Sequence, residues 1–206
     1  MSLDKYKEVI EEDFSKEAEL MSEVIKELDL GEDARILDIG TGFGAMSILL
    51  ALNGFRILTG QPEHDPEWDE FTADNGQSDA EHGHHHGNMD WRENAEKLGV
   101  SDKIEFQYLD AQDLAFENET FDGIFMYDAL QHIKDREKAL IECLRVLKND
   151  GVVCVIEWSK KSIKETEEKY GFTIDYVDPR EILPGADISI ELTSGESINI
   201  FTMKKK

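Results

Sequence analysis

The sequence predicts a doubly wound α/β fold, with a mostly parallel sheet and helices on both of its faces. Short apolar runs alternate with helix-like segments from residue 34 to residue 170, which is typical of strand–helix–strand units. The first apolar run leads through three alternating glycines into a helix-like run. Two strand-like runs around Ser194-Gly195-Glu196 end the chain, which predicts an antiparallel hairpin at one edge of the sheet.

The whole chain, residues 1–206, is expected to form one domain. Apolar residues recur every three or four positions from residue 5 to residue 28, so residues 1–30 are expected to hold an amphipathic cap helix. Residues 61–90 are polar, acidic and rich in histidine, and are expected to form a long loop insertion. Strands are expected at 36–39, 56–59, 103–109, 121–127, 152–158, 188–192 and 198–203, and further helices at 46–52, 91–98, 135–147 and 162–170.

The composition narrows the range of partners. The chain has 46 acidic residues against 22 Lys and Arg, which gives a formal net charge of −24. Such a surface repels nucleic-acid phosphates and anionic lipids, so neither nucleic acid nor a membrane is an expected partner. We also expect a cytoplasmic protein, because the sequence shows neither an apolar run of about 18 residues nor a signal pattern. Cys143 and Cys154 are expected to be reduced and buried.

The most informative segment is the glycine-rich turn after the first predicted strand. Asp38 ends that strand, and Gly40, Gly42 and Gly44 follow at alternate positions. Glycines there allow positive φ angles and let a ligand lie against bare backbone. A tight strand-to-helix turn without a ligand would show the same spacing. The segment Gly40–Ala45 also fits the G-x-G-x-x-A pattern of nicotinamide-binding domains, so an oxidoreductase is one alternative at this stage.

Three further segments favour a different cofactor. Asp110-Ala111 directly follows the third predicted strand, the segment 121–132 contains a buried strand and then Leu-Gln-His, and 144–151 reads Leu-Arg-Val-Leu-Lys-Asn-Asp-Gly. Together with the acid-x-Gly-x-Gly-x-Gly motif, they resemble the class I S-adenosylmethionine (SAM) dependent methyltransferases over residues 34–158. The resemblance implies a Rossmann-like, seven-stranded mixed sheet whose last strand is antiparallel, unlike nicotinamide-binding domains.

The resemblance also implies a cofactor site at the carboxyl ends of the strands, with SAM as methyl donor and S-adenosylhomocysteine (SAH) as product. Asp38 is expected to receive the ammonium group and Asp110 to contact the adenine. One position departs from the pattern: Gln61 stands where the family has Asp or Glu for the ribose hydroxyls, with Glu63 as a substitute. The expected cofactor residues are Asp38, Gly40, Thr41, Gly42, Gly44, Gln61, Asp110, Ala111 and Tyr127.

Methyl transfer from a sulfonium requires alignment of the acceptor, and a base only where the acceptor carries a proton. His132 is the candidate base and Asp128 a second catalytic candidate, since both follow the fourth predicted strand. In the alternative interpretation, His132 only packs at a helix start and Asp128 caps the turn. The Asn/Asp-Pro-Pro-Tyr motif of nucleic-acid amino methyltransferases is absent at 126–129, so a small-molecule acceptor is expected.

Five of the six histidines lie between His64 and His86. The cluster at 82–86 could bind a divalent metal ion, but its neighbouring glycines and the lack of a second anchoring pair favour a solvated or substrate-covering loop. No metal ligand is therefore assigned. Together with Gln61, this tract leaves a second hypothesis open: a non-catalytic SAM-fold protein with a regulatory or metal-responsive role.

Overall fold

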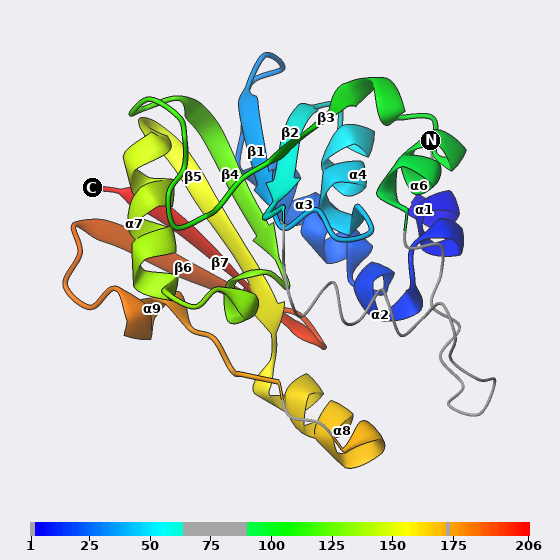
Figure 1. Cartoon of the computed structure of the whole chain (residues 1–206). Helices are drawn as coiled ribbons and strands as arrows, with labels where there is room; N and C mark the ends of the chain where they lie inside the picture. Colours follow the sequence, from blue (N-terminus) through cyan, green and yellow to red (C-terminus); the bar gives the residue numbers. More distant parts are fainter. Residues whose placement is uncertain (1–2, 64–89, 172–173) are drawn as a thin grey trace.

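The computed structural model describes residues 3–63, 90–171 and 174–206, and the described part contains a seven-stranded mixed sheet (Figure 1). The strand order is β3-β2-β1-β4-β5-β7-β6. The first five of these strands are parallel, and β7 runs antiparallel to both β5 and β6. The strands are β1 (Arg35–Ile39), β2 (Arg56–Gln61), β3 (Ile104–Tyr108), β4 (Phe121–Tyr127), β5 (Leu147–Trp158), β6 (Ile188–Ser194) and β7 (Ile198–Lys205).

Helices cover both faces of this sheet, as the doubly wound prediction requires (Figure 1). One face carries α1 (Leu3–Val9), α3 (Ala18–Glu27), α4 (Ala45–Leu52) and α6 (Trp91–Lys97). The other face carries α7 (Arg136–Val146) and α9 (Pro179–Ile182). The remaining described helices are α2 (Glu12–Ser15), η1 (Ser101–Lys103), η2 (Leu130–His132) and α8 (Lys160–Tyr170).

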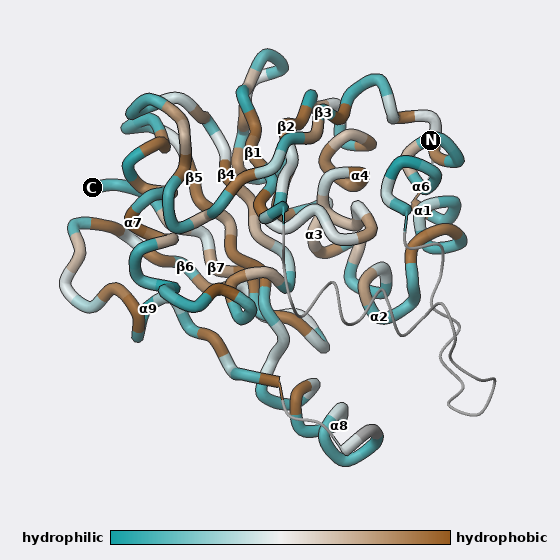
Figure 2. Tube along the Cα trace, viewed as in Figure 1, coloured by the Kyte–Doolittle hydropathy of each residue, from teal (hydrophilic) through white to brown (hydrophobic). Residues whose placement is uncertain are grey.

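Side chains that alternate along the strands build two cores, one on each face. Ile36 and Phe125 point into the core beneath α4, whereas Leu37 and Ile124 point into the core beneath α7. Figure 2 shows β4 and β5 as hydrophobic over most of their length, as expected for central strands that are covered on both faces. Within the part of the chain that the structure describes, no helix is long and apolar enough to cross a membrane.

The prediction of one continuous helix over residues 5–28 is wrong, because the structure divides this segment into α1, α2 and α3. Glu11 is extended (φ −50°, ψ 141°) and Glu17 is also non-helical (φ −98°, ψ 15°). Long-range contacts explain the breaks. Tyr6 donates its hydroxyl to the carbonyl of Ala45 (2.9 Å), and Glu17 accepts from the backbone N–H of Ser197 (2.6 Å). A straight helix cannot satisfy both contacts.

The other expected helices and strands are present, with shifted ends. The largest shift is in β5, which begins at Leu147 and so includes residues 149–151, ahead of the strand expected at 152–158. There the register between β4 and β5 is interrupted between Phe121 and Gly123, so the polar segment remains in the ladder as an irregularity. The short helices η1 and α9 are not predicted from the sequence. Asp178 caps the N-terminus of α9 by accepting from the backbone N–H of Arg180 (3.0 Å), and Pro179 occupies the first helical position.

Candidate active site

The glycine-rich turn lies between β1 and α4, at the carboxyl edge of the sheet. Here the strand order reverses, because β2 lies on one side of β1 and β4 on the other. Gly40, Gly42 and Gly44 all have positive φ angles (91°, 48° and 86°). A Cβ on Gly40 would lie 2.7 Å from the Cβ of Ala129, so the backbone there passes close to the segment after β4. The turn therefore leaves bare backbone and the N-terminus of α4 facing this edge.

Three hydroxyl groups hold the turn to Asp38, which is buried. Ser47 and Thr59 both donate to Oδ2 of Asp38, the latter at 3.0 Å. The Thr41 and Thr59 hydroxyl oxygens are 2.9 Å apart. Since Thr59 has one hydroxyl hydrogen and gives it to Asp38, Thr41 must be the donor in that pair. Two hydroxyl hydrogens therefore point toward one carboxylate oxygen, and Thr41, inside the turn, is linked to Asp38 through the Thr59 hydroxyl.

The second oxygen of Asp38, Oδ1, is buried and has no hydrogen-bond partner among the described residues. Burial raises the pKa of Asp38 to about 6, while the bonds from Ser47 and Thr59 oppose that shift. A buried acceptor without a donor costs free energy, and in native proteins such groups usually meet a ligand or an ordered water molecule. Asp38 therefore has one oxygen committed to the fold and one available to a donor from outside it.

Gln61 faces the same turn from the end of β2. Its side-chain oxygen Oε1 accepts from the backbone N–H of Gly42 (3.0 Å), so one of the two lone pairs of this oxygen is already used. The two N–H bonds of the amide group then remain for other partners. Glu63, the substitute considered from the sequence, is exposed. Gln61, which the sequence predicts at the ribose, thus supports the glycine turn, and its amide N–H bonds can donate to a ligand.

The segments after β3 and β4, together with the start of α7 and Asp175, line an open groove of about 960 Å³. Asp110 lies in it, and its Oδ1 accepts from the backbone N–H (2.8 Å) and the side chain (3.1 Å) of Gln112. Ala111, the next residue, is buried. His132 lines the same groove and is exposed. The structure therefore brings Asp110 and His132 to one groove, while Gly40, Gly42 and Gln61 are not among the residues that line it.

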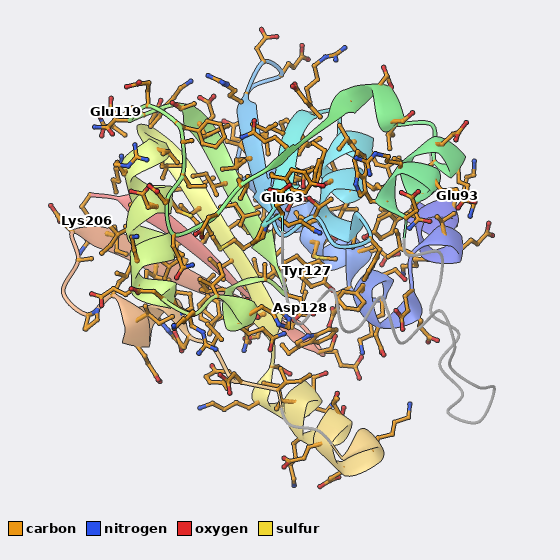
Figure 3. All side chains as sticks on the ribbon, in the orientation of Figure 1. Glu63, Glu93, Glu119, Tyr127, Asp128 and Lys206 are labelled. Carbon is orange, nitrogen blue, oxygen red and sulfur yellow. The ribbon has the colours of Figure 1, made fainter. Side chains whose placement is uncertain are left out.

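Asp128 follows β4 directly and has a left-handed backbone (φ 53°), which is uncommon for a residue other than glycine. Figure 3 shows Tyr127 and Asp128 together at the carboxyl end of this strand. Burial raises the pKa of Asp128 to about 7, whereas His132 and hydrogen bonds from the side chains of Trp158 and Gln131 act in the opposite direction. Asp128 therefore changes its charge near neutral pH, a property suited to proton transfer.

The turn that holds Asp128 and His132 is fixed from two sides. Oε1 of Glu157, which is buried, accepts from the backbone N–H of Leu130 (2.8 Å). Arg136 donates to the carbonyls of Leu130 (3.2 Å) and Gln131 (2.7 Å) and pairs with Asp175 (2.7 Å). Burial, together with the nearby Asp128, raises the pKa of Glu157 well above its usual range. This clamp positions η2 without using a side chain of η2 itself.

Four aromatic side chains meet at the carboxyl ends of β4 and β5. The ring of Phe14, from α2, has its centroid 4.7 Å from that of Phe43, 5.6 Å from that of Tyr127 and 5.4 Å from that of Trp158, each in an edge-to-face arrangement. Phe43 belongs to the glycine turn. The Tyr127 hydroxyl donates to the carbonyl of Phe14 (3.2 Å), so Tyr127, expected at the cofactor, here contacts the N-terminal segment. We call these four residues the ring cluster.

Sequence reasoning missed several of these residues. Ser47 and Thr59 carry no motif of their own, and only their buried, polar positions beside Asp38 could have singled them out. Phe14 lies on the continuous apolar stripe of residues 5–28 in the sequence. That stripe does not indicate that Phe14 stands on a separate short helix and packs against Phe43, Tyr127 and Trp158. The histidine cluster at 82–86 lies outside the described residues. In the described part of the chain, no group of three or more His, Cys, Asp or Glu side chains is arranged to hold a metal ion.

The fold and the glycine turn at its switch point define a class I SAM-dependent methyltransferase architecture, with the antiparallel β7 that separates this class from nicotinamide-binding domains. The family model described as a methyltransferase domain matches residues 37–155, which is more than half of the chain. The chain therefore belongs to this family of class I SAM-dependent methyltransferases, and the prediction of the family is confirmed.

Two curated relatives show the kind of protein that the chain is similar to. A demethylmenaquinone methyltransferase of Clavibacter sepedonicus is 28% identical over 145 residues, covering 70% of this chain and 49% of the relative. A ubiquinone/menaquinone biosynthesis C-methyltransferase of Enterobacter sp. (strain 638) is 36% identical over 89 residues, covering 43% of this chain and 36% of the relative. The chain thus spans half or less of the length of these relatives.

Solved structures share the fold at low sequence identity. A protein of Pyrococcus horikoshii OT3 superposes with a TM-score of 0.63 at 20% identity, covering 93% of this chain and 90% of that one. A SAM-dependent methyltransferase of Aquifex aeolicus gives a TM-score of 0.56 at 20% identity, covering 88% and 87%. At these identities the comparison shows the fold alone, and it confirms the predicted fold class.

Proposed function

We propose that this chain transfers the methyl group of SAM to a small molecule bound at the carboxyl ends of β4 and β5. The observation that carries the proposal is the unpartnered Oδ1 of Asp38 beneath a glycine turn that opens onto the N-terminus of α4. The two features complement the two charges of an amino-acid tail: an acceptor for the ammonium group and a helix N-terminus for the carboxylate. Because Oδ1 is covered, we expect a bridging water molecule to carry its contact with the ammonium group.

The remaining cofactor contacts follow from the same edge of the sheet. We expect the amide N–H bonds of Gln61 to donate to ribose hydroxyls, and Asp110, with Ala111 beside it, to contact the adenine. Gly40, Gly42, Gly44 and Thr41 shape the turn around the tail. When bound, SAM supplies an electrophilic methyl group on a sulfonium. The protein has to hold the acceptor in line with that group and keep water away.

For the acceptor, we propose Asp128 as the group that takes a proton and His132 as the second candidate, since the two interact electrostatically beside the groove. The clamp of Glu157 and Arg136 keeps both on a fixed turn. The two relatives are named for a demethylated quinone and for C-methyl transfer, which agrees with a small-molecule acceptor. The net charge of −24 also disfavours nucleic acid as the acceptor.

The first test is calorimetric titration of SAH and of SAM into chelator-treated protein. We expect a micromolar Kd for SAH without added metal. Absence of binding both with and without a divalent metal ion would contradict the proposal. Binding that requires the metal would instead support the metal-responsive hypothesis for the chain.

Substitution of Gln61 tests its part in cofactor binding. In Gln61→Glu, one carboxylate oxygen can keep the bond to Gly42 and the other can accept from a ribose hydroxyl, so we expect SAH to bind roughly tenfold tighter. Gln61→Ala loses both contacts, and we expect roughly tenfold weaker binding. Asn118→Asp, which adds the same charge in the loop before β4, is the control and should leave the Kd unchanged. Equal affinities in all variants would show that Gln61 does not face the cofactor.

The pH dependence tests Asp128. Because only the ionised carboxylate accepts a proton and its pKa lies at about 7, we expect kcat to rise through neutral pH and to level off above it. Asp128→Asn should lower kcat by about 100-fold or more and remove this step in the profile. The measurement is the pH–rate profile with an acceptor found by screening compounds against labelled SAM. Asp102→Asn, at an exposed carboxylate in η1, should keep the wild-type profile; an unchanged profile in Asp128→Asn would exclude Asp128 as the base.

A further inference from the structure

The ring of Phe14 lies where the proposed acceptor has to be. Its three aromatic neighbours come from the glycine turn, from the last residue of β4 and from the last residue of β5. All three segments end at the carboxyl edge, next to Asp128, to which the Trp158 side chain donates a hydrogen bond. The protein thus fills the space beside its candidate base with a planar ring of its own.

The segment that carries this ring is a helix of a single turn. The helix α2 has four residues, its N-cap residue Glu11 makes no side-chain capping bond, and Ser15 is the residue of α2 that is fully buried. Phe14 itself is only partly buried. A single turn of helix has little stability of its own, so its position depends on tertiary contacts, among them those of Phe14.

Firm anchors lie on either side of it. On the N-terminal side, Tyr6 is fully buried beneath α4 and bonded to Ala45. On the C-terminal side, Oε1 of Glu17 accepts from both the N–H (2.6 Å) and the hydroxyl (3.0 Å) of Ser197. Residues 11–16 therefore form a strap that is fixed at both ends. Between these ends it contacts the ring cluster through Phe14, through the Tyr127 hydroxyl bond and through the Lys16 ammonium group, which lies over the Trp158 ring (5.9 Å).

We propose that the acceptor is a molecule with a planar aromatic ring, which takes the place of Phe14 among Phe43, Tyr127 and Trp158 while the strap moves aside. This inference rests on the proposed function and names the substrate class of that site. The edge-to-face arrangement supports it, because three rings placed around a fourth favour a flat π system over a saturated ring of the same size. Phe14 is then a specificity-determining residue, since its ring competes with the acceptor.

The test uses 2-naphthol and its saturated analogue decahydro-2-naphthol as probes of the full chain saturated with SAH. We expect Phe14→Ala to bind 2-naphthol at least tenfold tighter than the wild type, because the competing ring is gone. Decahydro-2-naphthol should bind at least fivefold more weakly than 2-naphthol. Phe116→Ala is the matched control: Phe116 is also partly buried and in edge-to-face contact (4.9 Å to Phe121), but away from the strap, so it should behave as the wild type.

Hydrogen exchange locates the bound ring. On addition of 2-naphthol to the wild type, amides of residues 11–16 should exchange faster, while those of α3 stay unchanged. Phe14→Leu covers the case in which Phe14→Ala folds poorly, because leucine keeps an apolar contact without a ring. It should also bind 2-naphthol more tightly than the wild type, with a smaller gain in affinity than Phe14→Ala. No gain in either variant, or no change in exchange of the strap, would overturn the proposal. SAH binding is measured in the same samples, so loss of the cofactor site is distinguished from failure of the ring site.

Discussion

Asparagine in place of Asp38 is expected to weaken SAH binding by at least 100-fold while leaving the protein folded. The oxygen of asparagine can take over the two hydroxyl bonds from Ser47 and Thr59. Its amide nitrogen then stands in place of Oδ1 and presents a donor where the ammonium side of the cofactor needs an acceptor. A loss of 100-fold corresponds to about 2.7 kcal/mol, a reasonable cost for removing a charge-assisted acceptor from a buried site.

The stability of Asp38→Asn separates binding from folding. Asp38 has a pKa of about 6 in the folded protein and an ordinary value of 3.8, so the folded state holds the proton more tightly. Its contribution to stability is therefore largest at low pH and is lost as the pH rises through 6. Asparagine never has to be buried as a charge. At pH 8 the melting temperature of the variant should equal or exceed that of the wild type.

The same carboxylate makes binding pH-dependent. A proton on Asp38 competes with the ligand, so wild-type SAH affinity should fall below pH 6, whereas Asp38→Asn should lack this dependence. Asp122→Asn is the matched control, since Asp122 pairs with Lys148 (2.8 Å) at the amino end of β4. It should change stability slightly and leave the Kd unchanged. Wild-type affinity in Asp38→Asn would show that Oδ1 has no part in binding.

A second large effect is expected for Gly60→Ala, on stability. A Cβ at Gly60 would lie 2.1 Å from the carbonyl oxygen of Gln107 and 2.7 Å from Cδ2 of Leu109. The carbonyl is part of the β2–β3 ladder and cannot move away without separating the strands. We expect the free energy of unfolding to fall by roughly 3 kcal/mol or more, at the upper end of what overpacking costs. Urea denaturation measures this loss.

Gly60→Ala should also disturb the cofactor site, because the carbonyl of Gly60 accepts from the N–H of Gly40 (2.8 Å). Displacement of β2 would carry the glycine turn with it. Gly31→Ala is the control, since no heavy atom lies within 4 Å of its added Cβ, and it should change the unfolding free energy by less than about 0.5 kcal/mol. Similar stability of both variants would mean that β2 and β3 do not approach this closely.

The sequence was sufficient for the parts of the molecule in which local pattern and tertiary contact agree. The run before Asp38 is apolar and short, its glycines match the backbone angles that the turn adopts, and β5 is rich in β-branched residues where it is central. Each of these signals is local, and the family resemblance then implied a seven-stranded mixed sheet with an antiparallel last strand. The seven strands were accordingly expected close to where they lie.

What could not be predicted depends on partners far away in the chain. The stripe from Tyr6 to Leu28 has helical spacing throughout, yet the helix breaks because Tyr6 and Glu17 are held by α4 and by the segment before β7. Gln61 is expected at the ribose hydroxyls, and the structure adds that its side-chain oxygen accepts from the N–H of Gly42, a contact that spacing does not reveal. The roles of Asp128 and His132 remain predictions, now with His132 in the groove and with Glu157 and Arg136 holding the turn that carries both residues.

The bond between Glu17 and Ser197 also bears on the order in which the two halves of the site form during folding. It joins residues 180 positions apart, whereas the bonds of Asp38 and Gln61 join residues separated by 9 to 21 positions. Closing a longer loop costs more chain entropy, so contacts of low sequence separation form earlier. The cofactor half should therefore become structured early, and the strap over the acceptor half should close only after β6 and β7 have joined the sheet.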